Sequence, residues 1–155
     1  MIYKTITEGV FNSKLLYILF NYLANIGFKH KRENLIYFAF VLLKKTLRCC
    51  PMYYLFEALE KIKPSISLKF YKQTYKKNKT KLKAIPYPLI ISQQYKKSLY
   101  WFFKSIQKKT DKSFTLKIVY ELYKINLYNL SDAILKKYEY YKYATLFKTS
   151  SRFKW

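Results

Sequence analysis

The residues that could do acid–base, redox or metal chemistry are few in this chain. His30 is its single histidine, and its two cysteines are the neighbours Cys49 and Cys50. Three such side chains are too few for a zinc site, and adjacent cysteines cannot link distant segments. We expect both thiols to be buried at the start of a helix. Because we find no nucleophile–base pair and no glycine-rich phosphate loop, we expect no enzyme, no metal and no cofactor.

The chemistry that the sequence does carry is the binding of polyanions. No Asp or Glu occurs between Glu60 and Asp111, and Tyr, Trp and Phe are interleaved with the lysines of this interval. Solvated protein surfaces usually carry both signs of charge, so a one-signed aromatic stretch predicts contact with sugar–phosphate and bases. The fourteen lysines are Lys61, Lys63, Lys69, Lys72, Lys76, Lys77, Lys79, Lys81, Lys83, Lys96, Lys97, Lys104, Lys108 and Lys109.

The whole chain is equally one-sided, with 31 Lys and Arg against 8 Asp and Glu and a net charge of +23. This charge favours nucleic acid or an anionic membrane surface as the partner. The alternatives to RNA are a basic peripheral membrane protein and a nucleoid DNA-binding protein. The apolar run at residues 15–28 is interrupted by Asn21 and Asn25 and is shorter than the span of about 20 residues that a bilayer requires. We therefore expect no membrane partner, and RNA recognition by shape and phosphate contacts, since lysine is a point charge.

The N-terminal third predicts an arm and two helices. Residues 1–12 read as an arm, Ser13 as a helix cap and Gly27 as the residue past the end of that helix. The apolar positions of this first helix are Leu16, Leu19, Phe20 and Leu23. A basic loop at residues 28–32 then leads to a second helix. Its expected packing face is Leu35, Phe38, Ala39 and Leu42.

The centre of the chain predicts a helix followed by a β-ribbon. Pro51 suits the first turn of a helix, and Pro64 requires that helix to end before it. Its apolar face is Leu55, Ala58, Leu59 and Ile62. Beyond Pro64, Ile66, Leu68 and Phe70 alternate with polar residues, which is the period of a strand. We expect a two-stranded antiparallel ribbon at residues 66–88, with a basic tip at residues 75–80.

Three more helical patterns follow the ribbon. The first begins at Ser92, with an apolar face of Leu99, Phe102, Phe103 and Ile106, and with Lys97, Lys104 and Lys108 away from that face. A loop at 110–113 precedes a helix with inward Ile118, Leu122 and Ile125. Residues 126–130 connect it to a last helix capped by Ser131. The sequence thus predicts one mainly α domain over residues 1–155, of about six helices, with one protruding two-stranded antiparallel β-ribbon.

Several motifs together resemble a known family, the small-subunit ribosomal protein seven family (S-seven) of the universal bacterial type. The similar residues of the first two helices are Phe11, Ser13, Leu15, Leu16, Asn21, Leu23, Gly27, Lys29, Glu33, Tyr37, Ala39 and Leu43. Those of the centre and end are Ala58, Leu59, Glu60, Lys63, Pro64, Ile85, Pro86, Trp101, Lys108, Lys109, Lys112, Ser113, Leu116, Glu121, Leu122, Lys136, Lys137, Glu139, Ala144, Lys148, Arg152, Phe153, Lys154 and Trp155. The resemblance covers about residues 11–155.

The resemblance implies a structural constituent of the small ribosomal subunit. Such a protein binds the 3′ domain of small-subunit rRNA, organises the head beside neighbouring head proteins, and lines the path of exit-site tRNA and mRNA. Residues expected at rRNA are Lys29, His30, Lys31, Arg32, Lys69, Lys72, Lys108, Lys109, Lys112, Lys136, Lys137, Lys148, Arg152, Lys154 and Trp155. Those expected near tRNA or mRNA are Lys76, Lys77, Lys79, Lys81 and Lys83. The family's paired glycines near the ribbon tip are absent here.

The composition also suggests where the protein works. Residues with AT-rich codons are over-represented, and lysine far exceeds arginine. We interpret this bias as the mark of an AT-rich organellar genome, which predicts the mitochondrial ribosome of the matrix, with a plastid-type organelle as the alternative. The first residues lack an Arg- and Ser-rich transit pattern, so we expect synthesis inside the organelle.

Overall fold

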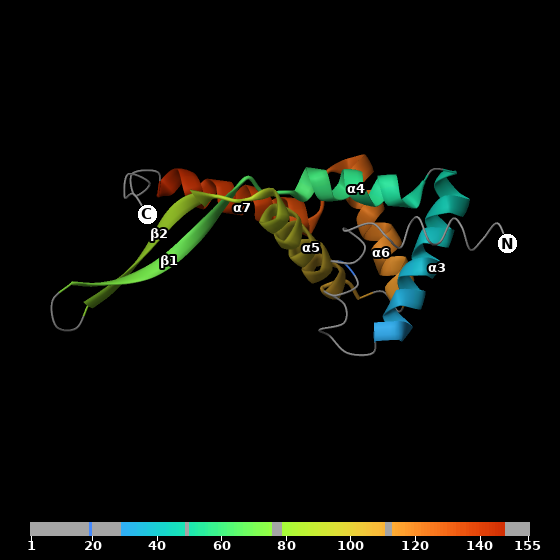
Figure 1. Ribbon diagram of the computed structural model, residues 1–155, viewed down its shortest axis with the longest axis horizontal. Coiled ribbons are helices and arrows are strands. Elements are labelled where there is room, and N and C mark those ends of the chain that lie inside the picture. The colour runs from blue at the N-terminus through green and yellow to red at the C-terminus, as the bar shows by residue number, and fades with distance from the viewer. Residues whose placement is uncertain (1–18, 20–28, 49, 76–78, 111–112, 148–155) are drawn as a thin grey trace.

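The computed structural model shows a helical body from which a long β-ribbon projects (Figure 1). It describes residue 19 and residues 29–48, 50–75, 79–110 and 113–147, with the backbone alone for 29–32, 71–75 and 79–83. The elements are α3 (Lys29–Leu47), α4 (Pro51–Ile62), β1 (Ile66–Tyr75), β2 (Lys79–Pro88), α5 (Ile91–Gln107), α6 (Phe114–Tyr123), the π-helical turn η1 (Lys124–Tyr128) and α7 (Asp132–Leu146).

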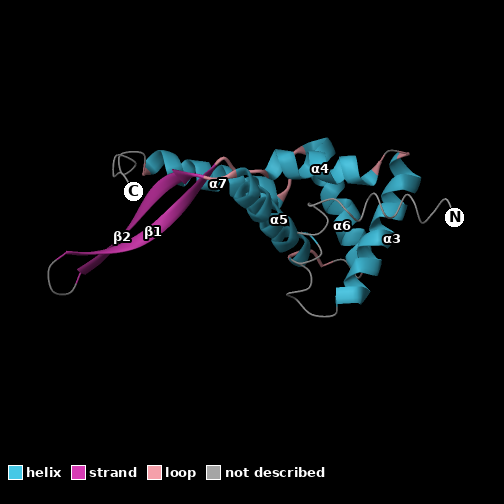
Figure 2. Cartoon of the chain, viewed as in Figure 1, coloured by secondary structure: helices cyan, strands magenta, loops and turns pink. Residues whose placement is uncertain are grey.

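This architecture confirms the expected fold class. The described residues form five α-helices, close to the six expected, and one two-stranded antiparallel sheet (Figure 2). The expected arm at 1–12 lies outside the described residues, as does the first helix except for Leu19, which is helical and buried in the core.

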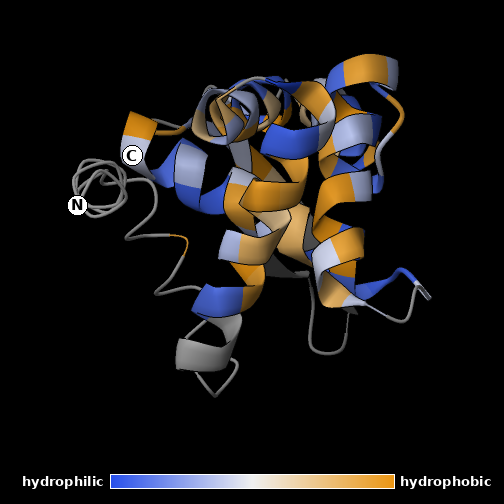
Figure 3. Cartoon of the chain, turned by 90° about the vertical axis from the view of Figure 1, so that its right-hand side faces the viewer, coloured by the Kyte–Doolittle hydropathy of each residue, from blue (hydrophilic) through white to orange (hydrophobic). Residues whose placement is uncertain are grey.

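The core lies where the helices of the body meet, and three expected packing faces are confirmed. Hydrophobic and hydrophilic segments alternate along the helices of the body (Figure 3). The buried residues include the whole expected faces of α4, of α5, and of α6 together with η1: Leu55, Ala58, Leu59, Ile62, Leu99, Phe102, Phe103, Ile106, Ile118, Leu122 and Ile125. Their regular 3.6-residue spacing is what made these faces predictable.

Helix α3 corrects two expectations. The backbone is already helical at Lys29, so most of the expected loop at 28–32 is the first turn of α3. The packing face is also rotated from the expected one. Ala39 is buried as expected, but Phe38 is 65% exposed and Leu42 is 37% exposed. The other buried residues of α3 are Ile36, Phe40 and Leu43. Because apolar residues occur on all sides of this helix, its periodicity did not identify the buried face.

The ends of the helices follow local chemistry. Pro51 stands in the first turn of α4 as expected, and the helix ends at Ile62, before Pro64. The expected burial of the thiols is wrong for Cys50, which caps α4 and is exposed, while Cys49 lies outside the described residues. A proline at the first helical position has no N–H and so needs no hydrogen-bond acceptor from the preceding residue, and the Cys50 side chain makes no capping hydrogen bond.

The link between α6 and α7 is more ordered than the expected connector at 126–130. It begins as the π-helical turn η1. The residue that follows this turn, Asn129, has φ of 51°. Asparagine tolerates this left-handed conformation better than most residues, which suits a chain with 2 Gly. The expected cap is confirmed, because the Ser131 hydroxyl accepts a hydrogen bond from Ala133 N at 3.0 Å.

The ribbon has a simple register, and it spans the expected residues 66–88. Ile66 pairs with Pro88 and Tyr75 with Lys79. Leu89 N donates to Ser65 O at 3.0 Å, so the hydrogen-bonded pairs of this antiparallel ladder are the odd-numbered ones. At the even-numbered positions of β2 the backbone N–H and C=O groups point away from β1. Two of these positions near the base are proline, Pro86 and Pro88. Since proline has no N–H, this part of the β2 edge offers no donor to another strand.

A core substitution tests the packing. We expect Leu99→Ala to lower the free energy of unfolding by about 2–5 kcal/mol, because Leu99 is fully buried and its loss leaves a cavity. The matched control Leu116→Ala removes the same atoms at an exposed position of α6, and should change it by about 0.5 kcal/mol or less. Urea unfolding followed by circular dichroism measures both. Equal losses would contradict this core.

Candidate nucleic-acid interface

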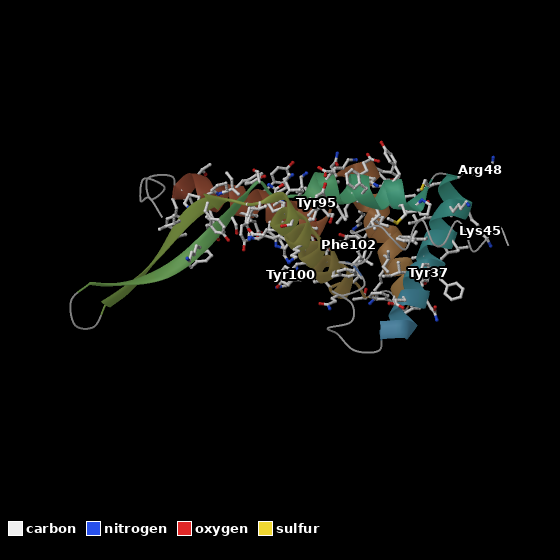
Figure 4. The ribbon with its side chains drawn as sticks, viewed as in Figure 1. Tyr37, Lys45, Arg48, Tyr95, Tyr100 and Phe102 are labelled. Carbon is white, nitrogen blue, oxygen red and sulfur yellow. The ribbon has the colours of Figure 1, made fainter. Side chains whose placement is uncertain are left out.

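Cationic side chains lie at both ends of the described body. Lys45 and Arg48 lie at the end of α3 far from the ribbon (Figure 4). On the ribbon side, Lys69, Lys96 and Lys104 are exposed. The first turns of α3, α4, α5 and α6 contain no acidic residue. The partial positive charge of these four helix ends is therefore not offset by a carboxylate of the helix's own first turn.

The residues expected to bind RNA are distributed over several elements. The backbone of Lys29, His30, Lys31 and Arg32 forms the first turn of α3. Lys69 and Lys72 are both on β1, but they are three residues apart and so fall on opposite faces of the ribbon. Lys79, Lys81 and Lys83 share one face of β2. Outside the described residues lie Lys76, Lys77, Lys112, Lys148, Arg152, Lys154 and Trp155.

Lys108 and Lys136 form a small cationic cluster with Lys104, where α5 meets α7. Lys108 Nζ lies 3.3 Å from the Asp132 carboxylate. Lys136 Nζ is buried and has no hydrogen-bond partner among the described residues. Burial lowers the pKa of Lys136, and the charges of Lys104 and Lys108 lower it further. An anion placed here would relieve this mutual repulsion.

Lys109, by contrast, has its charge engaged inside the body. Its Nζ lies 2.7 Å from the buried Glu121 carboxylate and 4.1 Å from the centre of the Tyr120 ring. Glu121 also accepts hydrogen bonds from Ser105, at 2.7 Å, and from Ser131. This network joins α5, α6 and the cap of α7. The sequence contained a signal for it, because Glu121 falls between the inward positions Ile118, Leu122 and Ile125.

Lys137 and Lys61 are also used internally. Lys137 Nζ donates to Lys61 O at 2.7 Å, and Lys61 Nζ donates to Asn126 O at 2.9 Å. Lys61 Nζ also lies 3.0 Å from the Glu57 carboxylate. These contacts tie α4 to α7 and η1, so the two ammonium groups are less available to a ligand than their sequence positions suggested.

Lys97 corrects another expectation, because it does not point away from the packed side of α5. Its Nζ lies 4.2 Å from the Tyr140 ring centre and 5.6 Å from that of Trp101, and it donates to the Ser67 hydroxyl. Burial lowers the pKa of Lys97. The contact holds the base of the ribbon between α5 and α7. Lysine periodicity gave no signal for it, since the partners are distant in sequence.

A cleft of about 350 Å³ opens beside this contact, between the base of the ribbon and α5. It is lined by Ser67, Tyr87, Leu89, Gln93, Lys96, Lys97 and Tyr100. Lysines and tyrosines side by side are suited to phosphates and to bases, respectively. Sequence reasoning did not single out Lys96 or Tyr100.

The described residues lack a metal site and a membrane-spanning helix. They contain no group of three or more His, Cys, Asp or Glu able to hold a metal ion. Nor do they contain a helix with the length and apolar character to cross a membrane.

The fold and the surface define a class: a basic helical RNA-binding protein with a projecting ribbon. The sequence model of the family described as Ribosomal protein S7p/S5e matches residues 2–148, and the chain belongs to this family. It is therefore a structural protein of the small ribosomal subunit that binds rRNA, and the family is not one of enzymes. A search of curated proteins found no match.

The buried network makes a prediction about stability. We expect Glu121→Ala to lower the free energy of unfolding by about 3–5 kcal/mol, because it leaves the Lys109 ammonium buried without its partner. The control Glu139→Ala removes an exposed carboxylate and should cost about 0.5 kcal/mol or less. Urea unfolding measures both. A small effect of Glu121→Ala would contradict a structural role for the network.

Proposed function

We propose that this protein binds the 3′ domain of small-subunit rRNA, helps to organise the head among its neighbouring proteins, and lines the exit-site tRNA and mRNA path. The observation that supports this proposal is the separation of two cationic regions. One is on the helical body, and the other is on a ribbon that projects from it (Figure 1). The excess of residues with AT-rich codons favours a mitochondrial ribosome as the setting, with a plastid-type organelle as the alternative.

The body supplies the anchor for rRNA. The residues Lys29, Lys31 and Arg32, with His30 between them, stand in the first turn of α3, which contains no acidic residue. Cations at a helix N-terminus are unfavourable for the isolated helix, whereas a phosphate there gains from both the side chains and the free backbone N–H groups. The cluster of Lys104, Lys108 and Lys136 is a second place where phosphate would relieve repulsion.

The ribbon supplies a separate contact. Its base is held between α5 and α7, while its outer part extends beyond the helices (Figure 1). A projecting element on a rigid scaffold is a common carrier of function. In this proposal the lysines near its tip, including Lys79, Lys81 and Lys83, lie near tRNA or mRNA.

Salt dependence tests the proposed rRNA anchor. We expect the intact chain to bind a 3′-domain rRNA fragment with an affinity that falls steeply with salt, by about 0.7–0.9 log units per log unit of salt for each phosphate contacted. Replacing Lys29, Lys31 and Arg32 by Ala should weaken binding and reduce this slope without lowering the urea midpoint, since cations at the N-terminus of a helix do not stabilise it.

The matched control removes the same charge from the other end of α3. It is Lys44→Ala, Lys45→Ala and Arg48→Gly, with glycine chosen because Arg48 has φ of 52°. Equal losses in both triple variants would assign the anchor elsewhere. Tighter binding to anionic vesicles or to duplex DNA than to the rRNA fragment would favour the membrane or nucleoid alternative.

Shortening the ribbon tests the separate role of its tip. We expect replacement of residues 75–80 by a tight Asn-Gly turn to preserve folding and assembly into the subunit, because the body keeps its own rRNA contacts. Exit-site tRNA occupancy of the assembled subunits should fall. Filter binding of labelled tRNA to purified subunits measures this occupancy. If the shortened ribbon blocks assembly, and the subunits that do form keep their tRNA occupancy, the ribbon is instead mainly an rRNA anchor.

A further inference from the structure

The two faces of the ribbon have opposite chemistry. Residues that pair across the strands share a face, and successive pairs alternate between faces. The odd-numbered pairs are Ser67 with Tyr87, Lys69 with Ile85, Tyr71 with Lys83, Gln73 with Lys81, and Tyr75 with Lys79. The even-numbered pairs are Ile66 with Pro88, Leu68 with Pro86, Phe70 with Ala84, Lys72 with Leu82, and Thr74 with Thr80. The odd face therefore holds four lysines and three tyrosines, and the even face a single lysine.

The odd face continues into the basic cleft at the base of the ribbon. Ser67 and Tyr87 form the last odd pair, and both line the cleft of about 350 Å³ against α5. Lys96 and Tyr100 extend the same lysine–tyrosine chemistry onto α5. Lys104 lies one turn further along this helix, with its Nζ 5.8 Å from the Tyr100 ring centre. Lysines and tyrosines thus occur both on the odd face of the ribbon and, beyond the buried Ser67 and Ile85, in the cleft and on α5.

The even face continues into a groove of the opposite character. Leu68 and Ala84 pack with Ala144 of α7. Beside them lies an apolar groove of about 690 Å³, lined by Ser65, Ile66, Pro86, Tyr87, Pro88, Tyr141, Ala144 and Thr145. This groove has no charged side chain among its described lining residues. The even face is thus unsuited to a phosphate backbone over most of its length.

From this asymmetry we propose that the odd face of the ribbon and the adjoining cleft form a track for single-stranded RNA, with phosphates on the lysines and bases stacked on the tyrosines. The inference rests on the proposed function and assigns the RNA contact of the ribbon to one of its faces. Successive pairs on one face are about 6.8 Å apart, close to the length of one extended nucleotide. Stacking tolerates any base, so the track binds without sequence preference.

Adjacent lysines on opposite faces provide a matched test. Fluorescence anisotropy measures binding of the full chain to a labelled, unstructured oligouridylate across a range of salt. Lys83→Ala, on the odd face, should weaken binding and lower the salt slope by about 0.7, the value for one single-strand phosphate contact. Lys72→Ala removes the same charge from the even face and should change affinity by less than about twofold. Equal effects of the two substitutions would overturn the proposal.

Adjacent aromatic residues test stacking in the same assay. Tyr71→Leu should weaken binding at least about fivefold, the lower limit of what one stacked base contributes. Phe70→Leu, on the even face, should leave affinity unchanged. An unaffected Tyr71→Leu variant, or an equal loss in Phe70→Leu, would overturn the assignment.

Binding of the same four variants to the 3′-domain rRNA fragment separates the track from the proposed function. If Phe70→Leu and the two odd-face variants keep fragment binding while the odd-face variants lose the oligouridylate, the track is supported. Lys72→Ala is judged on the oligouridylate alone, because Lys72 is among the residues expected at rRNA. If the intact chain binds the fragment but none of the variants differs on the oligouridylate, the track is wrong and the proposed function stands. If the intact chain fails to bind the fragment, the proposed function fails, whatever the oligouridylate shows.

Discussion

The helical body must hold together against its own positive charge. A net charge of +23 on 155 residues repels itself in any compact arrangement, and 8 carboxylates cannot neutralise it. Burial of apolar side chains opposes the repulsion, but the structure also uses ammonium groups as internal ties. Lys109 meets Glu121, Lys137 meets a carbonyl oxygen, and Lys97 lies against two aromatic rings. Carbonyls and ring faces thus do part of what carboxylates do in a less basic protein.

The use of ring faces and carbonyls in place of carboxylates also gives a structural role to part of the unusual composition. The chain has 18 tyrosines, and several of the described ones supply ring faces for lysines or hydroxyls for polar contacts. Tyr95, for example, donates to Glu60 at the end of α4, and Lys63 lies 2.6 Å from the same carboxylate. These bonds lower the pKa of Glu60 although its burial acts to raise it. The lowered pKa favours the charged carboxylate at the end of α4, where it joins Tyr95 of α5 and Lys63.

Much of the fold could be predicted from the sequence, for reasons that differ between elements. The faces of α4, α5 and α6 follow from apolar spacing, and prolines marked the limits of α4. Strand alternation located the ribbon. Helix α3 was the exception, because its apolar residues surround it and the buried side depends on which neighbours cover it. The π-helical turn η1 has no local signature. It is joined to α4 by two hydrogen bonds, from the Asn126 side-chain amide to Tyr54 O and from Lys61 Nζ to Asn126 O.

The candidate site was less predictable than the fold. A run of lysines shows that a surface is cationic, but it does not show which ammonium groups already have partners. Lys108 and Lys109 are neighbours in sequence, yet one is exposed and the other is paired with a buried carboxylate. Lys69 and Lys72 likewise became distinct only when the strand register assigned them to opposite faces. Sequence reasoning identified the charge, whereas tertiary contacts decide how each charge is used.

The two prolines on the outer edge of β2 have a consequence for the chain before it reaches its RNA. A free two-stranded ribbon exposes both edges, and exposed edges are templates on which another copy can add a strand. Pro86 and Pro88 remove the donors nearest the base of the ribbon, where Leu68 and Ala84 make the strands most apolar. Towards the tip, repulsion between the lysines of two copies opposes the same pairing. Missing hydrogen-bond donors at the base and charge near the tip thus both oppose the addition of another strand to the β2 edge.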